Sequence, residues 1–348
     1  MLLLLRCRRP PARLTSAALG SGRAACGPPG STQGVKKGFP PVGDTPVDSD
    51  LILSSVASTA RRTISPGLAG VGLRTHALRL DNLSSDRFPR PAEEFLLASR
   101  LRRCDRETLL SIASYGADCE VVTRSRTDRE PEAGADLLPL APSSPLEAGL
   151  TAAVASRRSV RTWSGEPVRQ EELAAVVRHA ASVTAEGVAD LMTGGTVPVA
   201  LRAAPSAGGL YPVQLWVAVR RVAGMDPGVL RYLPDRDALA RHAGPEAVDT
   251  LLASFDVQDG TVELDRAAAV LLLVARPWRA MRKYGPRGMR FVFHEAGAIA
   301  QNAHLAVTAL GLGAVDFSGF YDDESNNALD IDGVYECLVH TVIVGTPR

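Results

Sequence analysis

The stretch AAAVLLLVARPWRAMRKYGPRGMRFVFHEAGAIAQNAHLAVTALGLG, from Ala267 to Gly313, decides the fold class. Its first nine residues are all apolar, which is typical of a central strand buried on both faces. The residues from Met289 to Leu310 predict a long helix, ended by glycines that cannot continue it. A buried strand followed by a long helix indicates a layered protein that contains both sheet and helix.

The segments on either side extend this pattern. Two further helices are predicted, one starting at Ser144 and Pro145 and covering residues 146–158, and one over residues 171–181. Alternating apolar and polar residues predict a half-buried strand over 213–222, with a hairpin partner over 228–234. Short strands are also expected over 314–317 and 337–345. Hairpins together with helices indicate an α+β domain of about 200 residues.

Length, composition and charge limit the classes of protein that fit. The chain has 348 residues, 45% of them apolar, and a net charge of +1. These values predict a folded core and give no electrostatic case for nucleic acid or an anionic membrane. Five cysteines show no metal-ligand spacing, which argues for a reducing compartment, here the cytoplasm, and against zinc or disulfides. No apolar run reaches the about 18 residues that a membrane span needs.

Three regions follow one another along the chain. Residues 1–75 are rich in Pro, Gly and Ser, and we expect them to be poorly ordered. Residues 1–43 contain no acidic residue, as in a transit peptide; we interpret them as the product of a start codon placed too early and exclude them from the fold. Residues 76–140 predict small helices and a polar linker, and residues 141–348 the main domain.

Lysine is almost absent from this chain. Of 39 cationic residues only three are lysines, and Lys36 and Lys37 lie in the N-terminal extension. Lys283 is therefore the single lysine of the predicted folded body. Lysine can lose its proton when it is desolvated or crowded by cations, whereas arginine keeps its charge. Lys283 is thus either a chance survivor or a base that arginine could not replace.

Three other motifs have both a chemical and a structural interpretation. SRRSVR (Ser156 to Arg161) offers guanidiniums to a phosphate, or is a solvated face. APSAGGLYPVQLW (Ala204 to Trp216) brings backbone close to a flat ligand, or is a structural turn. LGLGAVDFSGF (Leu310 to Phe320) lines a site, or is only a helix cap and a bulge. The long helix is rich in alanine and glycine, and lies either in the core or at a subunit interface.

In this order, RRSVRTWSGEPV, PSAGGLYPVQLWVAV and KYGPRGMRFVFHEAGAIAQNAHLAVTALGLGAVDFSGF resemble the flavin-dependent nitroreductase superfamily. Within it they resemble the SagB-type azoline dehydrogenases, which oxidise peptide thiazolines and oxazolines to thiazoles and oxazoles. The resemblance implies a nitroreductase-like FMN-binding α+β fold with a central mixed sheet flanked by helices and a small, mainly helical N-terminal part. It also implies a homodimer with FMN at the subunit interface, a modified precursor peptide as substrate, and a cyclodehydratase complex as a further partner.

The same resemblance implies a role for each matching residue. Lys283 and Tyr284 would be the catalytic pair, and no metal is expected. The residues that would contact FMN fall into three groups. The first group would hold the phosphate and ribityl chain: Arg157, Arg158, Ser159 and Arg161. The second would meet the flavin from the partner subunit: Ser206, Ala207 and Gly209. The third would pack against the flavin ring: Ser318 and Gly319. Reduced FMN would be reoxidised by oxygen.

Two departures from the family pattern bear on the substrate. Relatives often continue EAGH after the RG segment, whereas this chain has EAGA with Ala298. The polar segment YDDESNNALDID, residues 321–332, is longer than the pattern predicts. One alternative is therefore a flavin-dependent dehydrogenase that acts on a cyclic dipeptide, a carrier-bound azoline or a nitro compound. Another is a non-catalytic subunit of a peptide-modifying complex.

Overall fold

The structure is a computed structural model that describes residues 5–7, 91–101, 106–126, 136–191, 194–257 and 261–348. Apart from residues 5–7, the N-terminal extension predicted over 1–75 lies outside the described residues, as does 127–135 of the predicted linker. The chain forms two compact units, Met1–Arg9 with Phe95–Arg348, and Pro10–Glu94. The elements below belong to the first unit, apart from the first turn of one helix.

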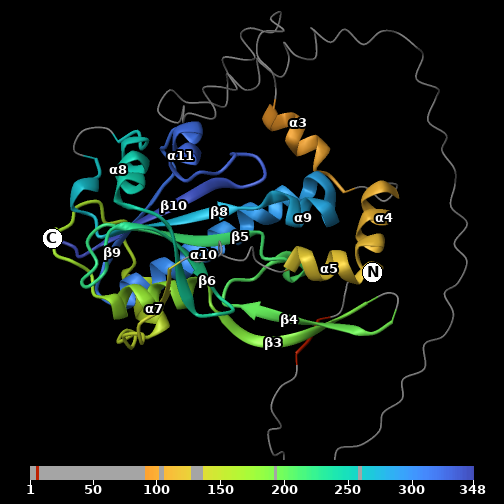
Figure 1. The fold of residues 1–348 in the computed structure, drawn as a ribbon, viewed down its shortest axis with the longest axis horizontal. Coiled ribbons are helices and arrows are strands. Elements are labelled where there is room, and N and C mark those ends of the chain that lie inside the picture. Colours follow the sequence, from red (N-terminus) through yellow and green to blue (C-terminus); the bar gives the residue numbers. More distant parts are fainter. Residues whose placement is uncertain (1–4, 8–90, 102–105, 127–135, 192–193, 258–260) are drawn as a thin grey trace, which may run out of the picture. The chain divides into compact units, whose positions relative to one another are not determined.

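A seven-stranded sheet forms the centre of this unit (Figure 1). The order of its strands is β2-β7-β6-β5-β8-β10-β9. In chain order these strands are β2 (Leu137–Pro139), β5 (Val213–Val219), β6 (Gly228–Leu233), β7 (Ala238–Ala243), β8 (Ala269–Ala275), β9 (Gly313–Phe317) and β10 (Cys337–Gly345). The last strand along the chain, β10, therefore lies between β8 and β9.

The fold class is confirmed, but the expectation of a mixed sheet is wrong for these strands. Every neighbouring pair in the sheet is antiparallel within the described part of the chain. Parallel pairing is limited to isolated bridges such as Ser159 with Ala314. The reason is the position of β10: β8 and β9 run in the same direction, and β10 separates them. Hairpin connections make β5, β6 and β7 antiparallel as well.

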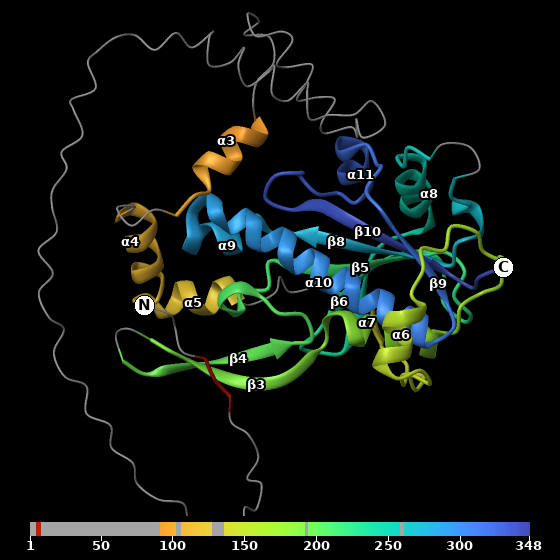
Figure 2. The same cartoon turned by 180° about the vertical axis from the view of Figure 1, so that it is seen from behind.

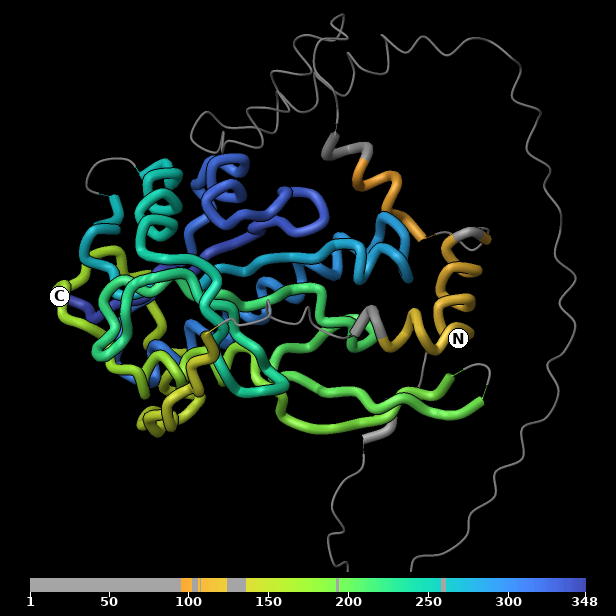
Figure 3. The backbone as a smooth tube through the Cα atoms, in the orientation of Figure 1, coloured from red at the N-terminus to blue at the C-terminus, as the bar shows by residue number. Residues whose placement is uncertain are grey.

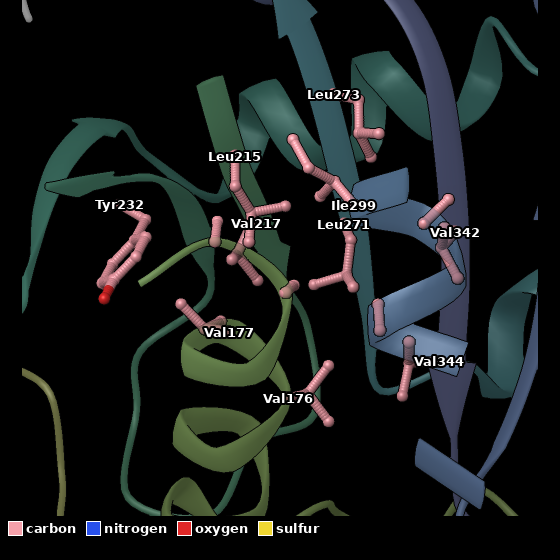
Figure 4. Packing of buried hydrophobic residues seen from close by; sticks show 14 of the residues in the cluster. Val176, Val177, Leu215, Val217, Tyr232, Leu271, Leu273, Ile299, Val342 and Val344 are labelled. Carbon is pink, nitrogen blue, oxygen red and sulfur yellow. The ribbon is translucent and has the colours of Figure 1, made fainter. Parts of the chain in front are cut away.

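Helices cover both faces of the sheet. On one face, α7 (Gln170–Ala181) and α10 (Gly288–Ala309) pack against β5, β8 and β10, as Figure 2 shows from behind. Figure 4 shows Val176 and Val177 of α7 and Ile299 of α10 beside strand residues. On the other face, α8 (Pro245–Ala253) contributes Val248 and Leu251 to a second core, next to α11 (Asp322–Ala328). A sheet covered in this way is buried on both sides.

This arrangement corrects the prediction for β5. Its alternating pattern predicted a strand with one solvent-facing side, yet all seven of its residues are buried. Gln214 and Trp216 face the second core rather than water, and the Trp216 indole donates a hydrogen bond to the Gln214 side chain (3.3 Å). The prediction that β8 is a central strand buried on both faces is confirmed.

Helix boundaries show where local signals were overruled. The long helix was predicted over residues 289–310, and α10 spans Gly288–Ala309. The helix expected to start at Ser144 starts later, because α6 is Leu150–Ser156 with Gly149 as its N-cap. The Ser144 N–H instead donates to the carbonyl of Glu171 (2.9 Å), which ties this segment to α7.

A second sheet was not predicted. Its order is β1-β3-β4, formed by β1 (Leu5–Cys7), β3 (Val183–Asp190) and β4 (Thr196–Arg202). Figure 3 shows the β3–β4 hairpin passing alongside α5 (Cys119–Arg126). In VTAEGVAD, apolar and polar residues alternate only over residues 183–186. Gly187 and the adjacent Val188 and Ala189 interrupt the alternation, so no strand was predicted there.

The N-terminal helical part is present in the described residues. The predicted small helices correspond to α3 (Pro91–Ala98) and α4 (Arg106–Tyr115). The next helix, α5, extends into the segment that we predicted to be a polar linker. Among the described residues, no helix has both the length and the apolar composition needed to cross a membrane.

Candidate active site

Lys283 and Tyr284 contact the segment PSAGGLYP (Pro205 to Pro212), called the glycine loop below, at Gly208. Both lie on α9 (Pro277–Tyr284), and the Lys283 side chain is buried, with only 3% of the residue exposed. A Cβ atom built on Gly208 would lie 2.6 Å from Tyr284 Oη and 3.0 Å from Lys283 Nζ. The backbone of the glycine loop therefore forms a wall directly against the two side-chain ends. Two motifs that are distant in sequence, PSAGGLYP and KYGPRG, form one site.

Strand pairing explains why these motifs meet. β5 starts at Val213, just after the glycine loop, and Val213 pairs with Ala275 at the end of β8. The helix α9 follows β8 after Arg276. The Arg276 N–H donates to the carbonyl of Pro212 (2.7 Å), and Arg279 Nη1 donates to the carbonyl of Tyr211 (2.8 Å). The loop and α9 are therefore held together where they leave the same end of the sheet.

The predicted loop residues shape a left-handed turn. Gly208 and Gly209 have φ values of +67° and +61°, a region that favours glycine. The Gly209 N–H donates to the carbonyl of Ser206 (3.1 Å), and the Tyr211 N–H donates to Ser206 Oγ (2.9 Å). Ala207 begins this turn. Gly208, which the resemblance did not single out, is the residue in closest contact with the Lys-Tyr pair.

Glu295 is a site residue that sequence reasoning missed. It is only 2% exposed on α10, and its Oε1 accepts a hydrogen bond from the Val213 N–H (3.1 Å). Burial raises the pKa of this carboxyl to about 7, against the opposing effects of Ser206, the Val213 N–H, Arg202 and Arg279. Helical spacing could have revealed it, because a lone acid occurs between Val292 and Ile299 on the apolar stripe.

Aromatic rings flank the buried lysine. Lys283 Nζ lies 4.8 Å from the ring centre of Tyr115 and 5.2 Å from that of Tyr284. The Tyr284 ring meets Phe291 edge to face at 5.0 Å. Tyr115 comes from α4, and Ser111 on the same helix donates a hydrogen bond to the carbonyl of Arg282 (2.9 Å). Part of the predicted 76–140 region thus contributes directly to the surroundings of Lys283.

The arginine cluster, formed by Arg157, Arg158 and Arg161, offers guanidinium donors. Arg158 Nη1 donates to the carbonyls of Ala155 (3.1 Å) and Arg157 (2.8 Å), and Arg161 Nη1 lies 3.5 Å from the Ser159 carbonyl. None of these three guanidiniums forms an ion pair with a carboxylate of the described residues. Arg158 and Arg161 are exposed, and Arg157 is half-buried. This donor set fits an anion such as a phosphate.

Within one chain the arginine cluster and the Lys-Tyr pair lie apart. Ser159 forms a bridge with Ala314, which pairs with Val344 and through it with Ala269, the first residue of β8. The glycine loop adjoins Ala275, the last residue of β8. A strand rises about 3.3 Å per residue, so about 20 Å of sheet separates the two positions. The structure brings the loop that contains Ser206, Ala207 and Gly209 to Lys283, through Gly208. It does not bring Arg157, Arg158, Ser159 or Arg161 there.

Ser318 belongs to a separate polar network with two histidines. Ser318 Oγ lies 2.7 Å from His340 Nδ1, and His340 Nε2 lies 2.9 Å from Asp316 Oδ1. The buried His304 places its Nε2 3.1 Å from the same carboxylate oxygen. These histidines hold the pKa of Asp316 well below its ordinary value. Gly319 follows Ser318 and accepts a backbone hydrogen bond from Asp256.

The histidines show no clustering in the sequence. His304 and His340 contact the same carboxylate, Asp316, because the fold brings them together. No cluster of three or more His, Cys, Asp or Glu side chains in the described residues has metal-binding geometry.

A cavity of about 1070 Å³ adjoins the glycine loop. Its walls come from the β3–β4 hairpin, from the loop and from the β6–β7 turn, and they include Val183, Glu186, Val199, Arg202, Gly209, Tyr211 and Asp235. Ligand cavities commonly measure roughly 300–1,000 Å³, so this space is large enough for more than a small metabolite.

Comparison with known proteins gives consistent matches. Residues 154–346 match the model of the Nitroreductase family. MJ1384 of Methanocaldococcus jannaschii, provisionally named as a nitroreductase, is 36% identical over 175 residues, which are 50% of this chain and 81% of that protein.

Solved structures match at lower identity. A nitroreductase-type protein from Ralstonia eutropha JMP134 is 22% identical, with 61% of this chain and 90% of that chain aligned and a TM-score of 0.48. The E. coli microcin synthetase McbBCD complex with truncated pro-MccB17 bound contains a chain that is 19% identical, with 76% and 100% aligned and a TM-score of 0.44.

Proposed function

Because this chain belongs to the nitroreductase family, we propose that it is an FMN-dependent oxidoreductase that converts peptide thiazolines or oxazolines to thiazoles or oxazoles. The observation that carries this proposal is the contact of Lys283 and Tyr284 with Gly208. The Lys283 amine, which is the proposed base, lies against the glycine loop, and the resemblance assigns this loop to the flavin. A general nitroreductase would have no evident use for a base in this position.

The chemistry requires a base. Forming the aromatic azole removes two electrons and two protons from the azoline ring. When bound, FMN supplies the two-electron acceptor for the hydride. Lys283 takes the other ring proton: a C–H bond breaks, an N–H bond forms at Nζ, and the electron pair stays in the ring. Tyr284 orients the amine and can share the proton through its hydroxyl. Dioxygen is the proposed final electron acceptor.

The remaining predicted residues would hold the cofactor. Arg157, Arg158 and Arg161 form no ion pair with an acid in the part of the chain that the structure describes. With Ser159 they would bind the FMN phosphate and ribityl chain. The glycine loop, with Ser206, Ala207 and Gly209, would meet the flavin ring through its backbone. Ser318 and Gly319 would pack against the same ring from another subunit.

A second copy of the chain is part of this proposal. The phosphate-binding residues and the Lys-Tyr pair lie at opposite ends of β8, so a complete site would combine one group from each of two copies. Exposed apolar side chains support such an interface. On α6, next to the arginine cluster, Leu150 is 70% exposed and Val154 is 57% exposed. On α10, Phe293 is 50% exposed beside Gly297, which has open space around it.

The cavity beside the glycine loop is the proposed entry for the peptide. Gly209 and Tyr211 line it together with residues of the β3–β4 hairpin. A modified precursor peptide extended along this hairpin would bring an azoline ring toward Gly208. A cyclodehydratase that forms the azoline would deliver this substrate, and we propose it as a partner.

The test is direct. The purified protein is expected to be yellow with bound FMN, and to remove two hydrogen atoms from a synthetic thiazoline-containing peptide, measured by mass spectrometry. If the protein is yellow but acts only on a cyclic dipeptide or only on a nitro compound, that compound class replaces the peptide azoline as the proposed substrate. A colourless protein that binds no added FMN would favour a non-catalytic subunit instead.

A further inference from the structure

We propose that Tyr115 is a positioning residue of the active site, and that its ring holds the Lys283 side chain against Gly208. This inference rests on the proposed role of Lys283 as the base. It makes the helix α4, which lies outside the part of the chain that matches the family model, a functional part of the site.

The surroundings of Lys283 Nζ come from three different elements. The Tyr115 ring centre on α4 is 4.8 Å away and the Tyr284 ring centre on α9 is 5.2 Å away. The backbone of Gly208 forms the third side, since a Cβ there would come within 3.0 Å of Nζ. With 3% of Lys283 exposed, bulk water cannot take the place of these contacts.

Tyr115 is itself held firmly. It is 3% exposed, and it packs with Val122 of α5 and Leu210 of the glycine loop in a small apolar cluster, with Tyr284 at its edge. The hydrogen bond from Ser111 to the carbonyl of Arg282 fixes α4 to α9 one residue before the lysine. Its ring therefore contacts the lysine while its cluster includes a residue of the glycine loop.

This position has a chemical consequence. An aromatic face attracts an ammonium group more than a neutral amine, and the effect is largest where water is excluded. When Lys283 takes a proton from the azoline ring, its amine becomes an ammonium. The Tyr115 ring stabilises this product of the proton transfer, and it opposes the penalty that burial places on the new charge. The charged and titratable residues beside Lys283 on α9 are Arg279, Arg282 and Tyr284. The buried Glu295 lies on α10, and the exposed Arg106 lies at the start of α4.

Four variants of the full chain, loaded with FMN, separate positioning from packing. Tyr115→Phe keeps the ring, whereas Tyr115→Leu and Tyr115→Met remove it and keep apolar volume. Val122→Ala loosens the same cluster and leaves the ring in place. On a synthetic thiazoline-containing peptide, we expect Tyr115→Leu and Tyr115→Met to lose about 30-fold in kcat/KM, equivalent to about 2 kcal/mol. Tyr115→Phe and Val122→Ala are expected to stay near the parent protein.

A spectroscopic readout needs no substrate. The chain has three lysines, so selective ¹³Cε-lysine labelling gives a simple spectrum, and the Lys283 signal is identified by its absence in Lys283→Arg. A ring next to the side chain shifts this signal. We expect the shift to persist in Tyr115→Phe and Val122→Ala and to disappear in Tyr115→Leu and Tyr115→Met, the latter serving if the leucine variant does not fold.

The two readouts also separate this inference from the proposed function. An unmoved Lys283 signal in the variants without a ring overturns the role of Tyr115, whatever the activity. If Tyr115→Phe loses as much activity as Tyr115→Leu, the inference is overturned as well, because the aromatic ring would then not be what positions Lys283. If Lys283→Arg keeps full activity, the proposed base is wrong, while the ring-dependent signal still reports the contact.

Discussion

The two ends of the seven-stranded sheet differ in how complete they are. At the end formed by Val213 and Ala275, Lys283 is buried and Tyr284 is partly buried, against the backbone of Gly208 and the ring of Tyr115. At the end near Ala314 and Val344, the arginine cluster is largely exposed and has no acidic partner in the described residues. One chain therefore encloses the Lys-Tyr pair at the first end, called the closed end below, and leaves the arginine cluster exposed at the second, the open end. We therefore expect mutations at the closed end to change stability without any ligand, and mutations at the open end to have an effect only when a ligand is present.

The largest effect is expected from Lys283→Arg at the closed end. Charge and most of the side-chain length remain but the base is lost, so azole formation should fall by roughly 10²–10⁴-fold. FMN content should stay the same, because the proposed FMN contacts are made by other residues. Turnover by mass spectrometry and the flavin spectrum measure the two quantities. Arg282→Ala, at the exposed neighbouring position, is the matched control and should retain activity. Wild-type rates for Lys283→Arg would contradict the assignment.

Glu295 gives the closed end a pH dependence of its own. Its pKa is about 7 in the folded chain, above its ordinary value of 4.5. Between these values the folded state keeps a proton that the unfolded state has released, so stability falls as pH rises from about 4.5 to 7. The contribution is up to about 3 kcal/mol. Denaturant unfolding across this range measures it, and Glu295→Gln should flatten that part of the profile. If the substitution leaves the pH dependence of stability unchanged, the pKa of the Glu295 carboxyl is not raised in the folded chain.

Gly208→Ala tests the contact between the loop and the Lys-Tyr pair. The new Cβ would collide with Tyr284 Oη, and alanine is strained at a φ of +67°. We expect a loss of stability of about 2 kcal/mol together with reduced turnover. Gly149→Ala is the control, since that glycine has an extended backbone and nothing within 4 Å of its Cβ position. It should lose only the small stability that alanine costs at the N-cap of α6. Thermal unfolding of both variants shows whether the effect is specific to Gly208.

The smallest of these effects belongs to the open end. Arg157→Ala should weaken FMN binding by about tenfold, the loss of one charge-assisted hydrogen bond. Stability without FMN should not change, because the guanidinium has no ion pair among the described residues to lose. Arg169→Ala, which removes an exposed arginine paired with Glu172, should leave FMN affinity unaltered. If both substitutions weaken FMN affinity equally in titrations, the arginine cluster has no specific role in FMN binding.

Local patterns predicted much of the fold. The apolar run at residues 267–275 and the long helix that follows depend on composition and periodicity, and both were found within one or two residues. The β3–β4 hairpin and the late start of α6 could not be predicted in this way. Leu150 and Val154 of α6 have helical spacing, yet both are exposed. Helical spacing predicts that two residues share a face, but it does not predict which part of the protein covers that face.

The site was predicted unevenly for the same reason. Composition singled out Lys283 and the resemblance paired it with Tyr284, and the structure adds that both meet Gly208. Tyr115, Glu295 and the pairing of His304 with His340 through Asp316 depend on contacts between residues far apart in the chain. No spacing rule covers such contacts. The roles of the arginines, of Ser318 and of Gly319 toward FMN stay predictions.

The placement of β10 affects how a newly made chain folds. This strand follows β8 and β9 in the sequence but lies between them in the sheet. Until the ribosome has released residues 337–345, β8 and β9 each have an unpaired edge that could join a strand of another nascent chain. Assembly of the sheet is thus delayed until translation has passed these residues. A stalled or truncated product that stops before β10 is expected to aggregate or to occupy chaperones.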